Sequence, residues 1–318
     1  MYLAIEIGGT KLQLVLADAD LQVQERFRLA IDQAAGATGI CAQIKNTIHN
    51  LAQKDAVLAI GVGFGGPIDY KTGQIFVSHQ IAGWAGFNFV DWLQSVIKVP
   101  VFVDNDANVA ALGEAAKGAG QGFNPVFYMT IGSGIGGGLV VDGQLYHGAK
   151  PGEAEVGHIR LDRLGNTLES CCSGWATDQK VKAAILKEPH GILSKLAGNN
   201  QKGEAKYLKE AITLGDTAAK NIMAETTGDL AFGLSHVVHL FHPEVIVLGG
   251  GLSLVGEYFR AQVETALPQY VMKAFLPVPA IKLAQLAEDV VPMGALQLAY
   301  QQYKKGAYKF SKQDKLNN

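Results

Sequence analysis

The hydrophobic and polar positions of this chain group into short apolar runs that alternate with helical patterns. The first runs lie at residues 2–7, 12–17 and 22–28, and turns at Gly8-Gly9 and Ala19-Asp20 separate them, so three consecutive strands are predicted. Helical patterns then follow at 37–54, 88–98 and 107–117, with buried strands at 57–63 and 100–103 between them.

The opening pattern returns after residue 125. Strands are predicted at 126–131, 136–142 and 144–146, followed by helices at 173–188, 204–213 and 216–240, a strand at 244–248, and helices at 254–267 and 290–304. We interpret this as a second copy of one unit. Two similar α/β halves with a cleft between them are therefore expected.

Three glycine turns follow apolar strands in this pattern: Gly8-Gly9-Thr10-Lys11, Gly132-Ser133-Gly134 and Gly249-Gly250-Gly251. Any one of these turns, taken alone, is explained at least equally well as a tight hairpin turn. Three in one chain favour phosphate binding, because glycine lets the backbone approach a ligand and successive N–H groups can hold an anion.

Two familiar nucleotide motifs are excluded. The stretches that begin at Gly61 and Gly132 both satisfy G-x-G-x-x-G, but the first runs into Pro67 and a turn, and the second into the predicted strand 136–142. A dinucleotide-binding motif requires a helix directly after its glycines. The chain contains no Gly-Lys dipeptide, so a Walker A loop is also excluded.

Composition and charge narrow the class of protein. Of the 318 residues, 48% are hydrophobic and 18% charged, which is typical of a packed protein with room for two domains. A formal net charge of −2 shows no excess of positive charge that would favour binding to nucleic acid or to an anionic membrane. Three cysteines cannot form a disulfide framework, and the first residues are no signal peptide, so a cytoplasmic protein is expected.

A run of polar side chains, Asp104-Asn105-Asp106-Ala107-Asn108, ends a buried strand and begins a helix. Asp106 or Asn105 could simply cap that helix; one of the four polar side chains is expected to be a cap, with Asp104 or Asn108 favoured. Four caps on one helix are not needed, so a carboxylate at Asp106 is better explained by chemistry.

Several motifs together make the chain similar to one family. IEIGGTK, VDNDANVAALGE and EVGHI, with GFGGPID, GWAG, TIGSGIGGGLVVDG, HPEVIVLGGGLS and AEDVVPMGALQLA, occur in an order that resembles the ROK family of repressors, uncharacterised frames and sugar kinases. The resemblance implies two actin-like (ribonuclease-H-like) ATPase domains, 1–118 plus 290–304 and 119–289, with a disordered tail at 305–318.

The resemblance also implies roles for individual residues. Asp106 matches the catalytic base, and the sugar contacts match Gly66, Asn105, Asp106, Glu155, His158 and Glu169. The family's contacts to the ATP phosphates and to the adenosine match Gly8, Gly9, Thr10, Lys11, Gly132, Ser133, Gly134, Gly249, Gly250 and Gly251. Glu6 stands where the family more usually has aspartate.

The chain departs from the family between His158 and Glu169. The family's sugar kinases usually carry a cysteine-rich zinc loop here, whereas this interval is IRLDRLGNTL and holds no cysteine. Cys171 and Cys172 follow it, and as adjacent residues they are expected to be buried free thiols. We expect no zinc, with Asp162 in its place as the hydrogen-bond partner of His158.

The function implied by the resemblance is ATP-dependent phosphorylation of a hexose, glucose to glucose 6-phosphate in the first instance, with Mg²⁺. N-Acetylglucosamine, N-acetylmannosamine, mannose and fructose stay open as substrates, polyphosphate as donor, and a homodimer as assembly. A sugar-binding regulator without catalysis is the alternative. A repressor with a helix-turn-helix domain ahead of the first glycine turn is not expected, because that turn begins at residue 8.

Overall fold

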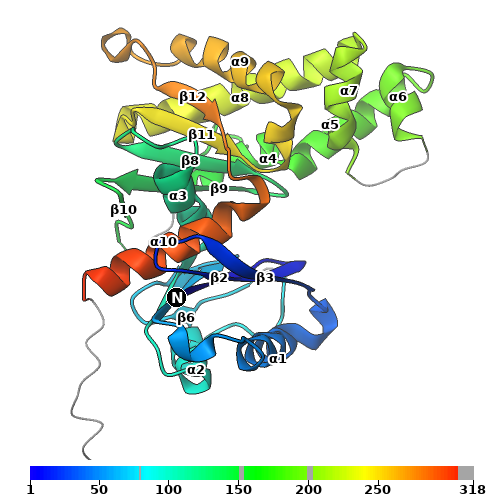
Figure 1. Ribbon diagram of the computed structural model, residues 1–318. Helices are drawn as coiled ribbons and strands as arrows, with labels where there is room; N and C mark the ends of the chain where they lie inside the picture. The colour runs from blue at the N-terminus through cyan, green and yellow to red at the C-terminus, as the bar shows by residue number, and fades with distance from the viewer. Residues whose placement is uncertain (79, 150–153, 199–202, 307–318) are drawn as a thin grey trace, which may run out of the picture. The chain divides into compact units, whose positions relative to one another are not determined.

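The computed structural model describes residues 1–78, 80–149, 154–198 and 203–306, which form two compact units. Unit 1 contains residues 1–113 with the described residues of 148–153 and 288–318, and unit 2 contains residues 114–147 and the described part of 154–287. In Figure 1, unit 1 is coloured blue and cyan with a red helix, and unit 2 runs from green to orange. Most of the expected tail, residues 307–318, lies outside the described residues.

Unit 1 is built on a five-stranded sheet in the order β3-β2-β1-β4-β7. Strands β1, β2 and β3 pair antiparallel, whereas β1, β4 and β7 run parallel. Its elements are β1 (Tyr2–Ile7), β2 (Lys11–Ala17), β3 (Val23–Ala30), α1 (Gly36–His49), β4 (Ala59–Phe64), β5 (Ile68–Asp69), β6 (Gln74–Ile75), α2 (Phe89–Val96), β7 (Val101–Asn105), α3 (Asp106–Lys117), which ends in unit 2, and α10 (Val290–Lys304).

Unit 2 repeats this order as β10-β9-β8-β11-β12, so the repetition predicted from the sequence is confirmed. Its elements are β8 (Val126–Ile131), β9 (Ile135–Val141), β10 (Gln144–Leu145), α4 (Leu168–Cys172), α5 (Gly174–Lys187), α6 (Ile192–Ala197), α7 (Leu208–Thr213), α8 (Thr217–Phe241), β11 (Val245–Gly249), α9 (Glu257–Ala266) and β12 (Ala280–Leu283). The edge strand β12 and the short helices α4 and α6 are absent from the sequence prediction.

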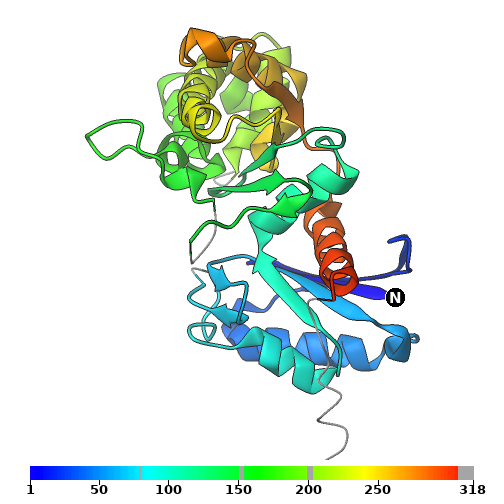
Figure 2. The same cartoon turned by 90° about the vertical axis from the view of Figure 1, so that its left-hand side faces the viewer.

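The two faces of the unit 1 sheet carry different helices, α1 and α2 on one and α10 on the other (Figures 1 and 2). Alternation along β1 explains this, because successive side chains point to opposite faces. Leu3 and Ile5 join the buried cluster that contains Ile40 and Ile44 of α1. Tyr2 makes an edge-on ring contact with Tyr300 of α10, with ring centres 5.6 Å apart.

Glycines allow α10 to lie directly against its neighbours. A Cβ on Gly61 of β4 would stand 1.9 Å from the carbonyl oxygen of Ala295 in α10. A Cβ on Gly294 of α10 would stand 1.8 Å from the carbonyl oxygen of Val109 in α3. Backbone contacts this close tolerate no side chain, so these glycines fix where α10 packs in unit 1.

Glu114 joins the first segment of unit 2 to residues 285 and 286 through hydrogen bonds. Its buried carboxylate accepts hydrogen bonds from the backbone N–H groups of Ala119 (2.7 Å), Gln285 (2.9 Å) and Leu286 (2.8 Å). A buried carboxylate is stable only when its oxygens are satisfied in this way. The glutamate of the VDNDANVAALGE motif therefore has a structural task in unit 2.

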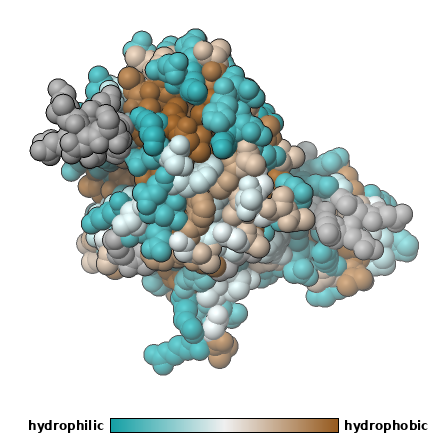
Figure 3. Space-filling view, turned by 90° about the horizontal axis from the view of Figure 1, so that it is seen from below, coloured by the Kyte–Doolittle hydropathy of each residue, from teal (hydrophilic) through white to brown (hydrophobic). Residues whose placement is uncertain are grey.

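The core of unit 2 lies between its sheet and the long helix α8. Phe127 and Met129 of β8 are buried in one cluster with Leu230 and Leu234 of α8. No helix within the described residues is both long and apolar enough to cross a membrane. The face of the molecule in Figure 3 shows apolar residues bordered by hydrophilic ones, a mixture that is ordinary for protein surfaces.

Candidate active site

Three predicted segments of unit 1 meet at one edge of its sheet. In the parallel register, Ile7 of β1 lies beside Phe64 of β4, which lies beside Asn105 of β7. The chain continues from these strand ends into Gly8, Gly65-Gly66 and Asp106, and the N–H of Gly65 donates to the carbonyl oxygen of Ile7 (2.9 Å). Ligands of open α/β sheets bind outside the carboxyl ends of parallel strands, so this edge is a candidate site.

Asn105 both caps α3 and contacts Gly66. Its Oδ1 accepts from the N–H of Ala107 (2.9 Å) and that of Asn108 (3.4 Å), and its Nδ2 donates to the carbonyl oxygen of Gly66 (3.3 Å). The expectation that Asp104 or Asn108 caps the helix is therefore wrong. Asp104 is buried, and its Oδ1 instead accepts from the N–H of Asn105 and the side-chain amide of Asn108 (both 2.9 Å).

Asp106 is the first residue of α3 and is half-buried. A Cβ on Gly65 would stand 3.3 Å from Asp106 Oδ2, so the carboxylate lies directly over that glycine, and the same Cβ would stand 3.7 Å from the Cα of Gly8. The partial positive charge of a helix N-terminus favours an ionised carboxylate there. The structure thus brings Asp106, Gly65 and the start of the first glycine turn together in unit 1.

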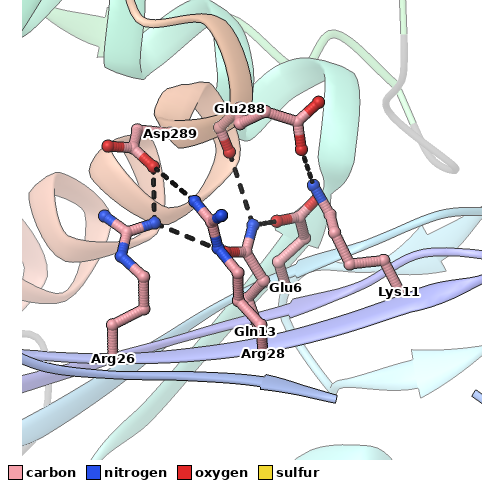
Figure 4. Close-up of polar contacts among 7 residues, drawn as sticks. All are labelled: Glu6, Lys11, Gln13, Arg26, Arg28, Glu288 and Asp289. Atoms are coloured by element: carbon pink, nitrogen blue, oxygen red, sulfur yellow. Dashed lines mark hydrogen bonds and ion pairs between the residues drawn. The ribbon is translucent and has the colours of Figure 1, made fainter. Parts of the chain in front are cut away.

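The first glycine turn is followed by a lysine held between two carboxylates (Figure 4). Lys11 Nζ lies 2.8 Å from Glu288 Oε2 and 3.4 Å from Glu6 Oε1, and the side-chain amide of Gln13 donates to Glu6 Oε2 (2.7 Å). Burial raises the pKa of Glu6 and outweighs the opposing effect of Lys11. Burial would lower the pKa of Lys11, but its hydrogen bond to Glu288 and the charge of Glu6 raise it. Lys11 is therefore held as a cation beside the turn.

The same network extends to the strands β2 and β3. Gln13 Oε1 accepts from Arg26 Nη1 (3.3 Å) and from Arg28 Nε (3.0 Å), and Arg26 forms an ion pair with Asp289 (Figure 4). Glu288 and Asp289 lie directly before α10. The network therefore fixes the first glycine turn to the start of that helix within unit 1.

Two further side chains at the first turn were not predicted from the sequence. Gly9 lies against Gln80, whose Oε1 would be 1.3 Å from a Cβ at position 9. Gln33 Nε2 also donates to the carbonyl oxygen of Gly9 (2.9 Å). Single amides in irregular segments carry no pattern, so nothing in the sequence indicated them.

The second glycine turn, in unit 2, is fastened by backbone contacts and by one carboxylate. The N–H of Gly174 donates to the carbonyl oxygen of Gly132 (2.7 Å), and Glu169 Oε2 accepts from the N–H of Ile135 (2.8 Å). A Cβ on Gly134 would stand 2.4 Å from that carboxylate oxygen. Glu169, predicted as a sugar contact, thus lies against the predicted phosphate turn, while the Ser133 side chain is exposed.

Glu155 and His158 lie together in unit 2, as their spacing predicts. Glu155 directly precedes the short helix η3 (Val156–His158), and His158 is the last residue of that helix. His158 Nε2 stands 3.9 Å from Glu155 Oε2, and the exposed side-chain fractions are 72% for His158 and 51% for Glu155. The N–H of Leu168 donates to the carbonyl oxygen of Ile159 (2.9 Å), which joins this segment to α4, the helix that carries Glu169.

The predicted pairing of His158 with Asp162 is wrong. Asp162 Oδ1 accepts from the backbone N–H groups of Leu164, Gly165 and Asn166, and Oδ2 accepts from the Asn166 side chain. These hydrogen bonds hold the pKa of Asp162 below its usual range. Asp162 closes its own turn, a local role typical of aspartate in loops.

The third glycine turn packs onto the second in unit 2. A Cβ on Gly249 would stand 2.4 Å from the hydroxyl oxygen of Tyr128, and Gly250, with φ of +81°, would bring a Cβ to 2.5 Å from the backbone of Ile131. Close packing therefore explains both glycines. Gly251, which has open space at its Cβ position, lines a cavity of about 630 Å³ together with Gly132 and Ser133.

The cysteines expected as buried thiols differ from each other. Cys172 is buried and its Sγ lies 3.4 Å from the carbonyl oxygen of Thr226, whereas Cys171 is half-buried, so the expectation is wrong for Cys171. Within residues 1–78, 80–149, 154–198 and 203–306, no group of three or more His, Cys, Asp or Glu side chains could hold a metal ion.

Comparisons with known proteins identify the family of the chain. Residues 2–302 match the model of the ROK family, and the chain belongs to that family. The crystal structure of a ROK family glucokinase from Streptomyces griseus, in complex with glucose and AMPPNP, is 29% identical with a TM-score of 0.80, covering 94% of this chain and 99% of that one. The fold is accordingly that of the actin-like ATPases.

Two curated relatives carry different names. The glucokinase of Thermotoga maritima is 28% identical over 304 residues, which is 93% of this chain and 96% of that protein. The putative xylose repressor of a Caldicellulosiruptor species is 27% identical over 213 residues, which is 64% of this chain and 52% of that protein. Proteins that are similar to this chain are thus named both as kinases and as repressors.

Proposed function

We propose that this protein is an ATP-dependent sugar kinase that transfers the γ-phosphoryl group of ATP to the 6-hydroxyl of glucose. The relatives named as glucokinases support the class of reaction and the choice of glucose. The observation that carries the proposal is the position of the Asp106 carboxylate, which lies over Gly65 next to the start of the first glycine turn.

Asp106 would act as the general base. Phosphoryl transfer passes through a loose transition state, so positioning of the reactants and neutralisation of charge supply most of the reduction in the activation barrier. The sugar hydroxyl is a neutral nucleophile and must lose a proton. A helix N-terminus favours the ionised form of a carboxylate, and in that form Asp106 can orient the hydroxyl and accept its proton.

Further polar groups would hold the sugar. One N–H of the Asn105 side-chain amide donates to Gly66, and the second remains for a hydroxyl oxygen. Glu155 and His158 are exposed and separated by more than a hydrogen-bond distance, so both can meet ring hydroxyls. Glu169 would join them through the oxygen that does not bind Ile135.

The glycine turns would hold ATP, which enters as its Mg²⁺ complex. Gly8, Gly9 and Thr10 offer backbone groups beside the Lys11 cation, and Gly132, Ser133 and Gly134 offer a second set. Gly249, Gly250 and Gly251 would face the adenosine. Both oxygens of Glu6 already face Gln13 and Lys11, which argues against Glu6 as a Mg²⁺ ligand, so we assign the ion to the phosphates and water.

We further propose that the enzyme needs no structural zinc. A structural zinc takes four nitrogen or sulfur ligands at about 2.0–2.3 Å. The segment between His158 and Glu169 offers no cysteine, and Cys172 faces a backbone carbonyl.

The test is ADP release by the purified protein with ATP, Mg²⁺ and a panel of hexoses and N-acetylhexosamines. We expect glucose to give the highest kcat/KM, with little release in its absence. A faster reaction with another sugar would reassign the substrate. If no sugar stimulated release but calorimetry showed sugar binding, the protein would be a sugar-responsive regulator instead.

A further inference from the structure

A cavity in unit 2 joins the second and third glycine turns to apolar side chains that the proposed function does not yet use. It measures about 630 Å³, within the usual size of small-molecule sites. Its lining includes Trp175, Asp178, Lys206, Lys209, Gly251 and Leu254.

Two large apolar side chains of this lining are exposed. Trp175 is 67% exposed and Leu254 is 71% exposed, whereas Trp84 in the core of unit 1 is 1% exposed. A single exposed apolar residue needs no explanation. Here two of them, from separate elements, border the same cavity, which indicates a ligand with a flat or apolar part.

Both side chains are placed by the glycine turns themselves. Trp175 directly follows Gly174, whose N–H donates to the carbonyl oxygen of Gly132 (2.7 Å). Leu254 belongs to η5 (Gly251–Val255), which begins at the third turn, where Gly250 packs on the backbone of Ile131. A group bound between Trp175 and Leu254 would therefore lie next to backbone amides suited to phosphate.

The remaining walls are fixed and carry positive charge. Asp178 Oδ1 accepts from the N–H of Ala205 (2.7 Å), which ties η4 (Glu204–Tyr207) to α5. Lys206 and Lys209 add two ammonium groups to the lining. The cavity thus combines an aromatic surface, an aliphatic surface, glycine backbone and cations, the set of groups that suits a nucleotide.

We propose that Trp175 is the stacking surface for the base of the nucleotide donor, and that this contact gives ATP its advantage over inorganic polyphosphate. This inference rests on the proposed kinase function. Aromatic stacking tolerates any base because every base has a π-face. Trp175 should therefore favour nucleotides as a class over polyphosphate, with little choice between ATP and GTP.

The kinetic test compares Trp175→Ala and Trp175→Phe with Leu186→Ala, which changes an exposed residue of the same helix outside the cavity lining. Loss of one stacking partner should raise KM for ATP and for GTP by the same factor, about 10-fold. Phenylalanine should restore most of the affinity, and Leu186→Ala should match the parent protein. Inorganic tripolyphosphate, which has no base, should inhibit the parent and Trp175→Ala with the same Ki.

Binding without turnover gives a second measurement. Of the three tryptophans, Trp175 is the exposed one, so acrylamide should quench it most, and ADP should protect it. If Trp175→Ala left KM for ATP and the Kd of ADP within twofold, or raised the Ki of tripolyphosphate by the same factor as KM, the inference would be wrong. If ADP protected Trp175 but no sugar were phosphorylated, the kinase proposal alone would fail.

Discussion

The first and second glycine turns occupy equivalent places in two sheets of the same strand order, yet they are built from different chemical groups. Each joins two antiparallel strands, β1 to β2 in unit 1 and β8 to β9 in unit 2. Next to the first turn, Glu6 pairs across the strands with Gln13. At the equivalent position beside the second turn, Thr130 pairs with Gly136.

The carboxylates near the two turns hold different partners. Glu6 and Glu288 hold the Lys11 ammonium, whereas Glu169 holds the backbone N–H of Ile135. The first turn therefore has a lysine cation beside it, and the second has a carboxylate that is bonded to its backbone. Under the proposed function the two turns would offer phosphate two kinds of contact, and changes at them should have different consequences.

The largest effect is expected from Gly134→Ala in the second turn. The new Cβ would stand 2.4 Å from Glu169 Oε2 and push the carboxylate away from Ile135. Losing an oriented contact of this kind should lower kcat/KM by about 10²-fold. Gly228→Ala in α8 is the control, because no atom lies within 4 Å of its Cβ position and the residue lies outside the glycine turns. Equal losses in the two variants would show that the Glu169 contact is unimportant.

A smaller effect is expected from Lys11→Met, which removes the charge at the first turn but keeps most of the side-chain volume. One charge-assisted contact to phosphate corresponds to a loss of about 10–100-fold in kcat/KM for ATP. Lys11→Arg keeps the charge and should lose less. Initial rates over a range of ATP concentrations give kcat/KM for both variants, and an unchanged kcat/KM in Lys11→Met would contradict the role of the charge.

Glu288→Gln should change stability only slightly. The pair is largely exposed at Glu288, so its contribution to the free energy of unfolding is below about 1 kcal/mol. The hydrogen bond from Lys11 lowers the pKa of Glu288 in the folded protein. The stabilisation is therefore present above the unfolded pKa and is lost as the pH falls through the folded one. Urea unfolding should show the two proteins converging in acid, and a growing difference there would contradict this assignment.

A chelator that would remove any zinc is expected to have no effect on turnover. Prolonged treatment with a strong chelator, followed by restored Mg²⁺, should leave turnover unchanged, and so should Cys171→Ser combined with Cys172→Ser. Elemental analysis of the purified protein provides the control. Stoichiometric zinc, or a collapse of activity in the double variant, would show that another set of ligands replaces the missing loop.

Periodic patterns made much of the fold predictable. The strand at residues 2–7, the strand at 126–131 and the helix at 290–304 have the predicted bounds, because long periodic runs pack as their pattern indicates. β12 was missed because it is only four residues long and follows Pro277 and Pro279. The predicted helix at 254–267 begins as η5 and reaches α-helical geometry only at Glu257, because Gly256, with φ of +90°, interrupts it.

Those residues of the candidate site that belong to sequence motifs were predictable. Asp106, Gly66 and the glycine turns lie at strand ends, where sequence patterns and sheet geometry agree. The partner of Lys11 was not predictable, since Glu288 is 277 residues away along the chain. Local competition explains two of the wrong assignments, because Asn105 and Asp162 each bond the nearest backbone N–H groups.

The central claim, that Asp106 is the base of a sugar kinase, is tested most directly by Asp106→Asn. The amide keeps the shape of the side chain but cannot accept the proton. We predict that kcat falls by about 10²-fold or more while the Kd of glucose, measured by calorimetry, changes less than threefold. Near-normal kcat with a large rise in Kd and KM would contradict the claim and make Asp106 a binding residue.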